Sequence, residues 1–113
     1  MRPDRVECEI EAMVGVESCP ETPDLQDTML TCEAVDASES GLQLMTDVPF
    51  PPHTRLSLRL DFGGELFRLD AVVRWLKGNR VGLLLDDMSQ DIDAWVSMFF
   101  FDEDYQLNIQ LAA

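Results

Sequence analysis

A carboxylate and a hydroxyl stand two residues apart in the stretch Asp36-Ala37-Ser38-Glu39-Ser40-Gly41, which lies between two apolar runs. In an extended chain, residues i and i+2 point to the same face, so the side chains of Asp36 and Ser38 can act together. A carboxylate accepts hydrogen bonds and a hydroxyl donates or accepts them, so the pair can bind the polar edge of a planar heterocycle. The alternative is a plain corner between two strands, since Asp, Ser and Gly all favour turns.

Six stretches with strand-like alternation of apolar and polar residues surround this corner. The Gly63-Gly64 and Gly78-Asn79 pairs are typical of two-residue hairpin turns. We therefore predict a mainly β fold, a six-stranded antiparallel barrel with one C-terminal α-helix, because closure removes exposed strand edges. The predicted strands cover residues 6–16, 29–35, 42–45, 56–62, 65–77 and 80–86.

The helix is predicted from apolar residues that recur at i, i+3, i+4, i+7 and i+8 from Ile92. Ser89 is the expected N-cap, which gives a helix over 89–104. We expect this helix to cover the outer side of the last strand, whose run Val81–Leu85 is apolar on both faces. Further apolar residues widen the helix stripe and indicate either more core or a surface for a homodimer or partner protein. These further residues are Met98 and Phe101.

The length predicts one domain over residues 1–113, made of an arm (1–5), a barrel (6–87), the helix (89–104) and a tail (105–113). Twenty-two acidic and eight basic residues give a net charge of −14. A general nucleic-acid binder needs many cations to neutralise phosphates, so this composition argues against nucleic acid and against an anionic membrane surface. The sequence shows neither a membrane-spanning apolar run nor a signal-peptide core, so a cytoplasmic protein without membrane insertion is expected.

The thiols and the single imidazole do not suggest catalysis. Three widely spaced cysteines argue against both a disulfide framework and a zinc site. Cys8 and Cys32 fall in the apolar phase of their strands and are expected in the core, whereas Cys19, beside Pro20, is expected to be an exposed thiol. His53 lies in a proline-rich loop with no nucleophile or metal ligand beside it. We therefore expect neither an enzyme nor a metal or other cofactor.

The order of elements and the corner motif resemble the PilZ domain, a bacterial receptor family for cyclic di-GMP that folds as a six-stranded barrel with a C-terminal helix. The resemblance covers nearly the whole chain, and the corner motif is its most specific part. It is carried by Arg5-Val6 at the first strand, by Asp36–Gly41, and by Ala71-Val72-Val73-Arg74-Trp75 followed by Arg80-Val81-Gly82-Leu83.

The resemblance implies a site for cyclic di-GMP and an effector protein as partner. Arginine forks match phosphate oxygens and the O6/N7 edge of guanine, and Arg5 takes the place of the second arginine of the family's Arg-x-x-x-Arg element. Asp36 would accept from guanine N–H groups, Ser38 would add a hydrogen bond and Gly41 would permit close approach. Trp75 either lines the site or is a core residue in phase with its strand. The implied ligand-binding residues are Arg2, Arg5, Asp36, Ser38, Gly41 and Trp75.

The arginine element departs from the family pattern. Counting back from Arg5, its first arginine falls on Met1, and Arg2 is the nearest replacement. Two hypotheses follow. The first is a cyclic di-GMP receptor or adaptor that transmits ligand binding to a partner protein. The second is a degenerate PilZ-like adaptor that binds no nucleotide and acts through protein contacts.

Overall fold

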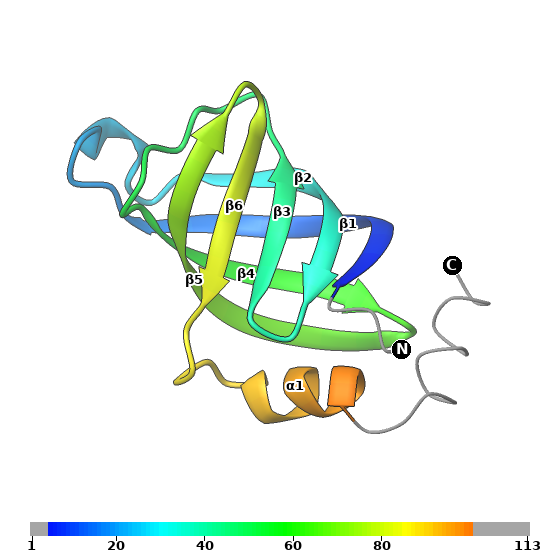
Figure 1. Ribbon diagram of the computed structural model, residues 1–113. Coiled ribbons are helices and arrows are strands. Elements are labelled where there is room, and N and C mark those ends of the chain that lie inside the picture. The colour runs from blue at the N-terminus through cyan, green and yellow to red at the C-terminus, as the bar shows by residue number, and fades with distance from the viewer. Residues whose placement is uncertain (1–4, 101–113) are drawn as a thin grey trace.

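The computed structural model describes residues 5–100, and the side chains of residues 6–99. Its strands close into one antiparallel barrel in the order β1-β2-β3-β6-β5-β4 (Figure 1). This confirms the predicted mainly β fold, and each predicted strand is present. The elements are β1 (Arg5–Ser18), a 3-10 helix η1 (Pro23–Leu25), β2 (Met29–Ser38), β3 (Gly41–Met45), β4 (Arg55–Phe62), β5 (Glu65–Lys77), β6 (Arg80–Leu85) and α1 (Ile92–Phe100).

Strand alternation builds the core as the sequence indicates. In β4, every second residue from Leu56 to Phe62 is buried and the residues between them are exposed. The turns also match, because Gly63, Gly64 and Gly78 have φ values of 65°, 85° and 62°. This left-handed region is open to glycine without steric cost. The hairpins β4–β5 and β5–β6 therefore have the turn chemistry that their sequences predict.

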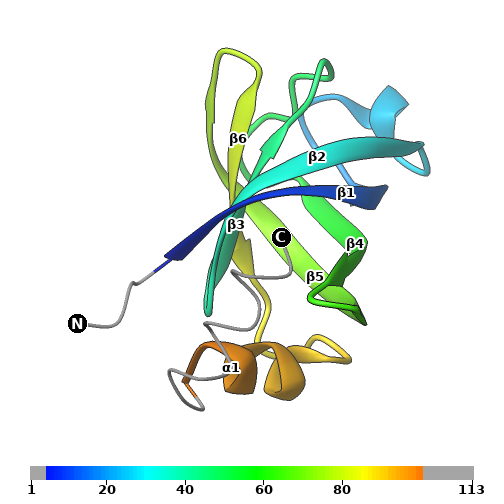
Figure 2. The same ribbon diagram turned by 90° about the vertical axis from the view of Figure 1, so that its right-hand side faces the viewer.

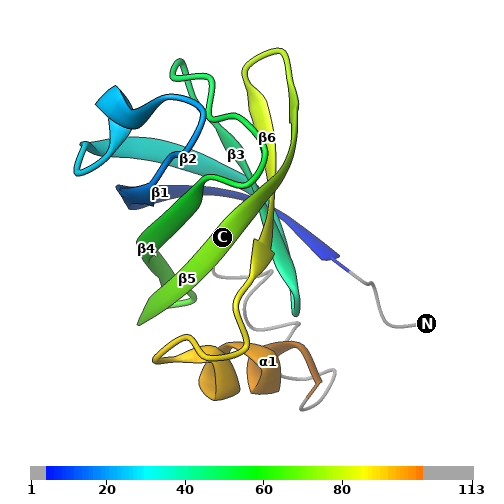
Figure 3. The ribbon, with the colours of Figure 1, turned by 90° about the vertical axis from the view of Figure 1, so that its left-hand side faces the viewer.

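Helix α1 lies across one end of the barrel (Figures 1, 2 and 3). Trp95 is completely buried there, and its ring stands edge-on to Phe62 and Phe67 with centroids 5.4 and 5.1 Å away. Met98 and Phe99 are buried as well, so these members of the widened apolar stripe belong to the core. Phe101 lies outside the described residues. The ring contacts, which join residues far apart in sequence, place the helix.

The expectation that the helix covers the outer side of β6 is wrong. Leu84, which points outward from β6, remains 39% exposed. The outer side of β6 is covered instead at Gly82, by the indole of Trp75 from the neighbouring strand. The Trp75 side chain of β5, and not the helix, therefore covers part of the outer side of the apolar run in β6.

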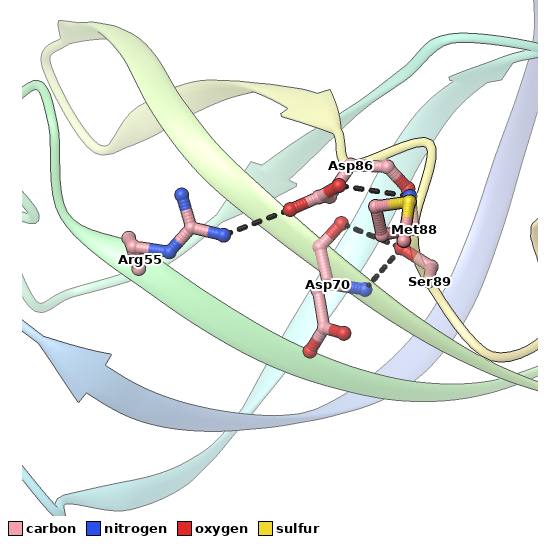
Figure 4. Close-up of polar contacts among 5 residues, drawn as sticks. All are labelled: Arg55, Asp70, Asp86, Met88 and Ser89. Atoms are coloured by element: carbon pink, nitrogen blue, oxygen red, sulfur yellow. Dashed lines mark hydrogen bonds and ion pairs between the residues drawn. The ribbon is translucent and has the colours of Figure 1, made fainter.

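Residues 86–91, which join β6 to α1, are fastened to β5 by a small hydrogen-bond network (Figure 4). The backbone N–H of Asp70 donates to Ser89 Oγ at 2.8 Å, and Ser89 Oγ donates to the Asp86 carbonyl at 2.6 Å. Arg55 forms an ion pair with the Asp86 carboxylate at 2.8 Å. A hydrogen bond from the Met88 N–H, together with this ion pair, lowers the pKa of the Asp86 carboxyl. Ser89 thus anchors the connection, and the helix begins at Ile92, later than the predicted N-cap.

Replacing Ser89 with alanine is expected to destabilise the domain by about 1–3 kcal/mol, because the Asp70 N–H would lose its acceptor in a buried place. Urea unfolding should show a lower midpoint with an unchanged slope. Ser57→Ala, at an exposed position of β4, is the matched control and should leave the midpoint unchanged. Equal midpoints for the two variants would contradict the anchoring role of Ser89.

The burial of one of the three cysteines differs from the prediction. Cys32 is buried and Cys8 is half-buried against the core, as expected from their strand phase. Cys19 is only 1% exposed, so its predicted exposure is wrong. The chain turns back directly after β1, and Cys19 Sγ lies 3.4 Å from Thr54 Oγ1 in the segment that precedes β4. A contact between two distant loops thus buries this thiol.

Candidate functional site

A row of cross-strand neighbours on the outer face of the barrel connects two candidate residues that are distant in sequence. Asp36 pairs with Gln43, Gln43 pairs with Gly82, and Gly82 pairs with Trp75. Directly paired residues of antiparallel strands share a face of the sheet. The barrel therefore brings Asp36 and Trp75 into one row that crosses β2, β3, β6 and β5.

A pocket of about 180 Å³ opens over this row. Its walls come from the same four strands, and Asp36, Ser38, Gly41 and Trp75 all line it. These are four of the six residues implied by the family resemblance. The other lining residues are Ala37, Ser40, Leu42, Gln43, Arg74, Gly82, Leu83 and Leu84.

The corner motif is shorter than expected, because β2 continues through Ser38. Ala37 is 1% exposed and points into the barrel, so Asp36 and Ser38 on either side of it point outward. Ser38 Oγ donates to the Gly41 carbonyl at 3.4 Å, which is long for a hydroxyl donor. Its oxygen keeps its acceptor capacity toward a ligand. The same-face prediction for the carboxylate and the hydroxyl is confirmed.

Trp75 lies on the outer face, so the alternative that it is a core residue is wrong. A register shift between β5 and β6 falls between Val73 and Trp75 and reverses the alternation of β5. Such a bulge inserts one extra residue and re-aims the side chains that follow. The indole is 40% exposed and lies on Gly82, where an added Cβ would be 2.1 Å from Trp75 Cε2. Gly82 therefore provides the place in which the indole rests.

Replacing Gly82 with alanine is expected to displace the Trp75 indole, because the new methyl group would occupy the space of the ring. Acrylamide quenching of tryptophan fluorescence should increase, and the change reports on Trp75 since Trp95 is fully buried. Gly15→Ala is the control, because the closest atom to its new Cβ would be the sulfur of the flexible Met29 side chain, with Ser57 Oγ 3.4 Å away. Unchanged quenching in Gly82→Ala would contradict the stacked arrangement.

Gly41 has a packing reason to be glycine. It is not among the glycines with positive φ, and an added Cβ would lie 2.6 Å from the Leu83 carbonyl oxygen. The close approach at this position is thus between the backbones of β3 and β6. The β2–β3 turn is tied to the same strand, because the Leu85 N–H donates to the Ser40 carbonyl at 2.8 Å.

Arginines approach the pocket from two sides. The Cα of Arg5 is the register partner of Ser38, so the start of β1 lies beside the pocket. Arg74 lines the pocket, and Arg80 Nη1 donates to Gln43 Oε1 at 3.4 Å. Arg2 lies outside the described residues. Sequence reasoning did not single out Gln43, although its polar side chain in the outward phase of β3 was a usable signal.

The outer face of β1 and β2 is strongly acidic. Glu7 is paired directly with Asp36 and Glu11 with Glu33, and like charges in such positions repel. Burial, together with the negative charges of Asp36 and Glu33, raises the pKa of the Cys8 thiol to about 11. An anionic ligand at the pocket therefore needs the arginines to offset this field.

A partly buried hydrogen bond connects the pocket to helix α1. The indole Nε1–H of Trp95 donates to the Ser38 carbonyl oxygen at 2.8 Å. Ser38 lines the pocket with its side chain, and its backbone holds the helix. This hydrogen bond joins the end of β2 to α1.

The described residues provide hydrogen-bonding and stacking groups in this pocket. Among residues 5–100 there is no group of three or more His, Cys, Asp or Glu side chains placed to hold a metal ion. His53 is exposed, with φ of 76°, in the loop before β4, and it does not line the pocket. The same part of the chain contains no helix long and apolar enough to cross a membrane.

Known structures share this fold. The PilZ domain of CeSA from a cellulose-synthesizing bacterium has 18% identity and a TM-score of 0.64, with 88% of this chain and 97% of that chain covered. The Bacillus subtilis inhibitor of motility (MotI/DgrA) has 16% identity and a TM-score of 0.67, with 96% and 53% covered. The PilZ domain of YcgR from Escherichia coli, solved with c-di-GMP, has 12% identity and a TM-score of 0.62, with 96% and 94% covered.

No curated protein sequence matches the chain. A family model does: the PilZ domain model matches residues 4–102, which include the whole barrel and α1. The match agrees with the corner motif, the strand order and the helix at the barrel end. The chain belongs to the PilZ domain family.

Proposed function

We propose that this domain is a cyclic di-GMP receptor that binds the nucleotide in the pocket over β2, β3, β6 and β5. The observation that carries the proposal is the convergence of Asp36, Ser38 and Trp75 on that one pocket, with the backbone of Arg5 paired to Ser38. The structural likeness to the YcgR domain, which was solved with c-di-GMP, supports it.

Each group has a role that its chemistry permits. The Asp36 carboxylate accepts from the N–H groups of a guanine edge, and Ser38 Oγ adds a polar contact. The Trp75 indole offers a face on which a base stacks. Arg5 and Arg2 from the arm, with Arg74 at the pocket, bind phosphate or guanine oxygens through their forked guanidinium groups.

The pocket holds only part of such a ligand. A volume of about 180 Å³ accommodates one base, below the 300–1,000 Å³ that is usual for small-molecule sites. The second base and the phosphates would then lie on the outer face, where the arm closes over them.

Isothermal titration calorimetry of the purified chain tests the proposal. Cyclic di-GMP should give saturable heat at micromolar protein, and cyclic di-AMP, whose adenines lack the guanine N1–H and O6 groups, should not. Absence of heat up to millimolar cyclic di-GMP would overturn the receptor function.

A second function is favoured by one feature, the absence of an arginine at the Met1 position of the family's paired element. In that case the domain is an adaptor that binds a partner protein without nucleotide. Trp75 and Leu84, both about two-fifths exposed, would then serve partner contact. Partner capture that persists in Asp36→Ala and without added nucleotide would distinguish this function from the receptor.

A further inference from the structure

The side chain of Gln43 lies in the middle of the row that crosses the pocket. Strand β3 runs between β2 and β6 (Figure 1), and on it Gln43 pairs with Asp36 on one side and with Gly82 on the other. Gly82 has no side chain, and the Trp75 indole rests over it. Gln43 therefore lies between the ring that offers a stacking face and the carboxylate that accepts hydrogen bonds.

A neighbouring arginine fixes which end of the Gln43 carboxamide turns to the pocket. Arg80 is two residues from Gly82 on β6, a diagonal position from which a long side chain reaches Gln43. A guanidinium group has only donors, and Arg80 Nη1 donates to Gln43 Oε1 at 3.4 Å, which is long for such a bond. Gln43 lines the pocket and Arg80 does not, so the amide oxygen is held away from it. The Nε2 group, which has no acceptor among the described residues, is left for the pocket side.

A donor at this position complements the group of guanine that Asp36 cannot bind. One edge of guanine presents N1–H and N2–H donors beside the O6 acceptor. A carboxylate only accepts, so Asp36 would repel O6, whereas an amide N–H donates to it. Adenine has an amino donor in place of O6, and the amide donor would find no acceptor there. The two neighbouring side chains together therefore match guanine and not adenine.

We propose that Gln43 is a specificity-determining residue, whose Nε2–H donates to O6 of the bound guanine, and that Arg80 is a positioning residue that keeps the amide in this orientation. The inference rests on the receptor function proposed above and adds the group that reads position 6 of the base. Arg80 is exposed, so solvent and salt screen its charge and its effect on the ligand passes mainly through the amide.

Isothermal titration calorimetry of Gln43→Met with cyclic di-GMP tests the contact. Methionine keeps the length of the side chain but has no N–H donor, so affinity should fall by about 2- to 12-fold, the usual value of one neutral hydrogen bond. A similar loss is expected in the Asp36→Ala background, because the two groups bind different atoms of the base. No loss in that background would show that Gln43 acts only through Asp36 and would overturn the direct contact. Gln26→Met, the same substitution at an exposed position outside the pocket, should leave affinity unchanged.

A double-mutant cycle tests the role of Arg80. Arg80→Met should weaken binding less than Gln43→Met, because a released amide still turns its nitrogen to the base part of the time. The same change should cause no further loss in the Gln43→Met background, and Arg80→Lys, which keeps a donor, should retain most of the affinity. Equal losses from Arg80→Met in both backgrounds would show that Arg80 attracts the ligand by its charge alone, which would overturn its positioning role.

NMR of the Gln43 side-chain amide separates a contact with the base from a merely structural role. Cyclic di-GMP should shift one of the two Nε2 protons downfield, because only one donates to O6, and Gln43→Met identifies these signals by their loss. Unchanged amide protons in a chain that binds the nucleotide, or equal affinities of Gln43→Met and the wild type, would overturn the inference and leave the receptor function standing. A wild type that gives no heat with cyclic di-GMP would overturn both.

Discussion

Replacing Trp95 with alanine is expected to destabilise the domain by about 3–5 kcal/mol, the usual cost of truncating a large buried aromatic side chain. Trp95 is completely buried and contacts the rings of Phe62, Phe67 and Phe99. Small domains have a total stability of only about 5–15 kcal/mol, so much of the population would unfold or lose α1 from the barrel end. Urea unfolding monitored by circular dichroism measures the loss.

Trp95→Phe separates the ring from its hydrogen bond. Phenylalanine keeps an aromatic ring in the core, but the Ser38 carbonyl loses the donor that now lies 2.8 Å away. An unsatisfied buried acceptor costs about 1–3 kcal/mol, so this variant should fall between the wild type and alanine. Trp75→Ala is the matched control on the surface and should cost less than either Trp95 variant. A Trp75 loss as large as that of Trp95→Ala would contradict the assigned roles.

The strands were predictable because their information is local. Each one repeats apolar residues with a period of two, and the Gly63-Gly64 and Gly78-Asn79 turns limit the possible pairings between neighbours. The position of α1 was not predictable in the same way. Its apolar stripe shows which face is buried, but only the contacts of Trp95 with Phe62 and Phe67 decide that this face meets the barrel end.

The residues of the candidate site also differ in whether local sequence was enough to predict their positions. Asp36 and Ser38 were predictable because two residues of one strand share a face. Trp75 was ambiguous because strict alternation places it in the core, and the bulge that turns it outward depends on the pairing of β5 with β6. The prediction that Cys19 is exposed was wrong for a related reason, since its burial comes from a contact with Thr54 in a distant loop. The register between strands and the contacts between distant loops cannot be read from the local pattern of a single sequence.

Replacing Asp36 with alanine is expected to weaken cyclic di-GMP binding by about 5- to 150-fold, if the domain is the receptor proposed above. The estimate follows from the value of one base-edge contact, about 1–3 kcal/mol. Asp36 lines the pocket in the same row as Trp75, and it is the only carboxylate among the described lining residues, so alanine removes the charged acceptor toward guanine. Calorimetry on the wild type and the variant measures the change directly.

Glu39→Ala is the control that removes an equal charge three residues further along the chain. Glu39 does not line the pocket, so its loss should leave affinity unchanged or raise it slightly by reducing repulsion of the phosphates. Raising the salt concentration screens that repulsion and should diminish any gain in Glu39→Ala, while the loss in Asp36→Ala should persist because it comes from a missing hydrogen-bond acceptor. Two variants with the same affinity and the same salt dependence would show that Asp36 acts only through its charge.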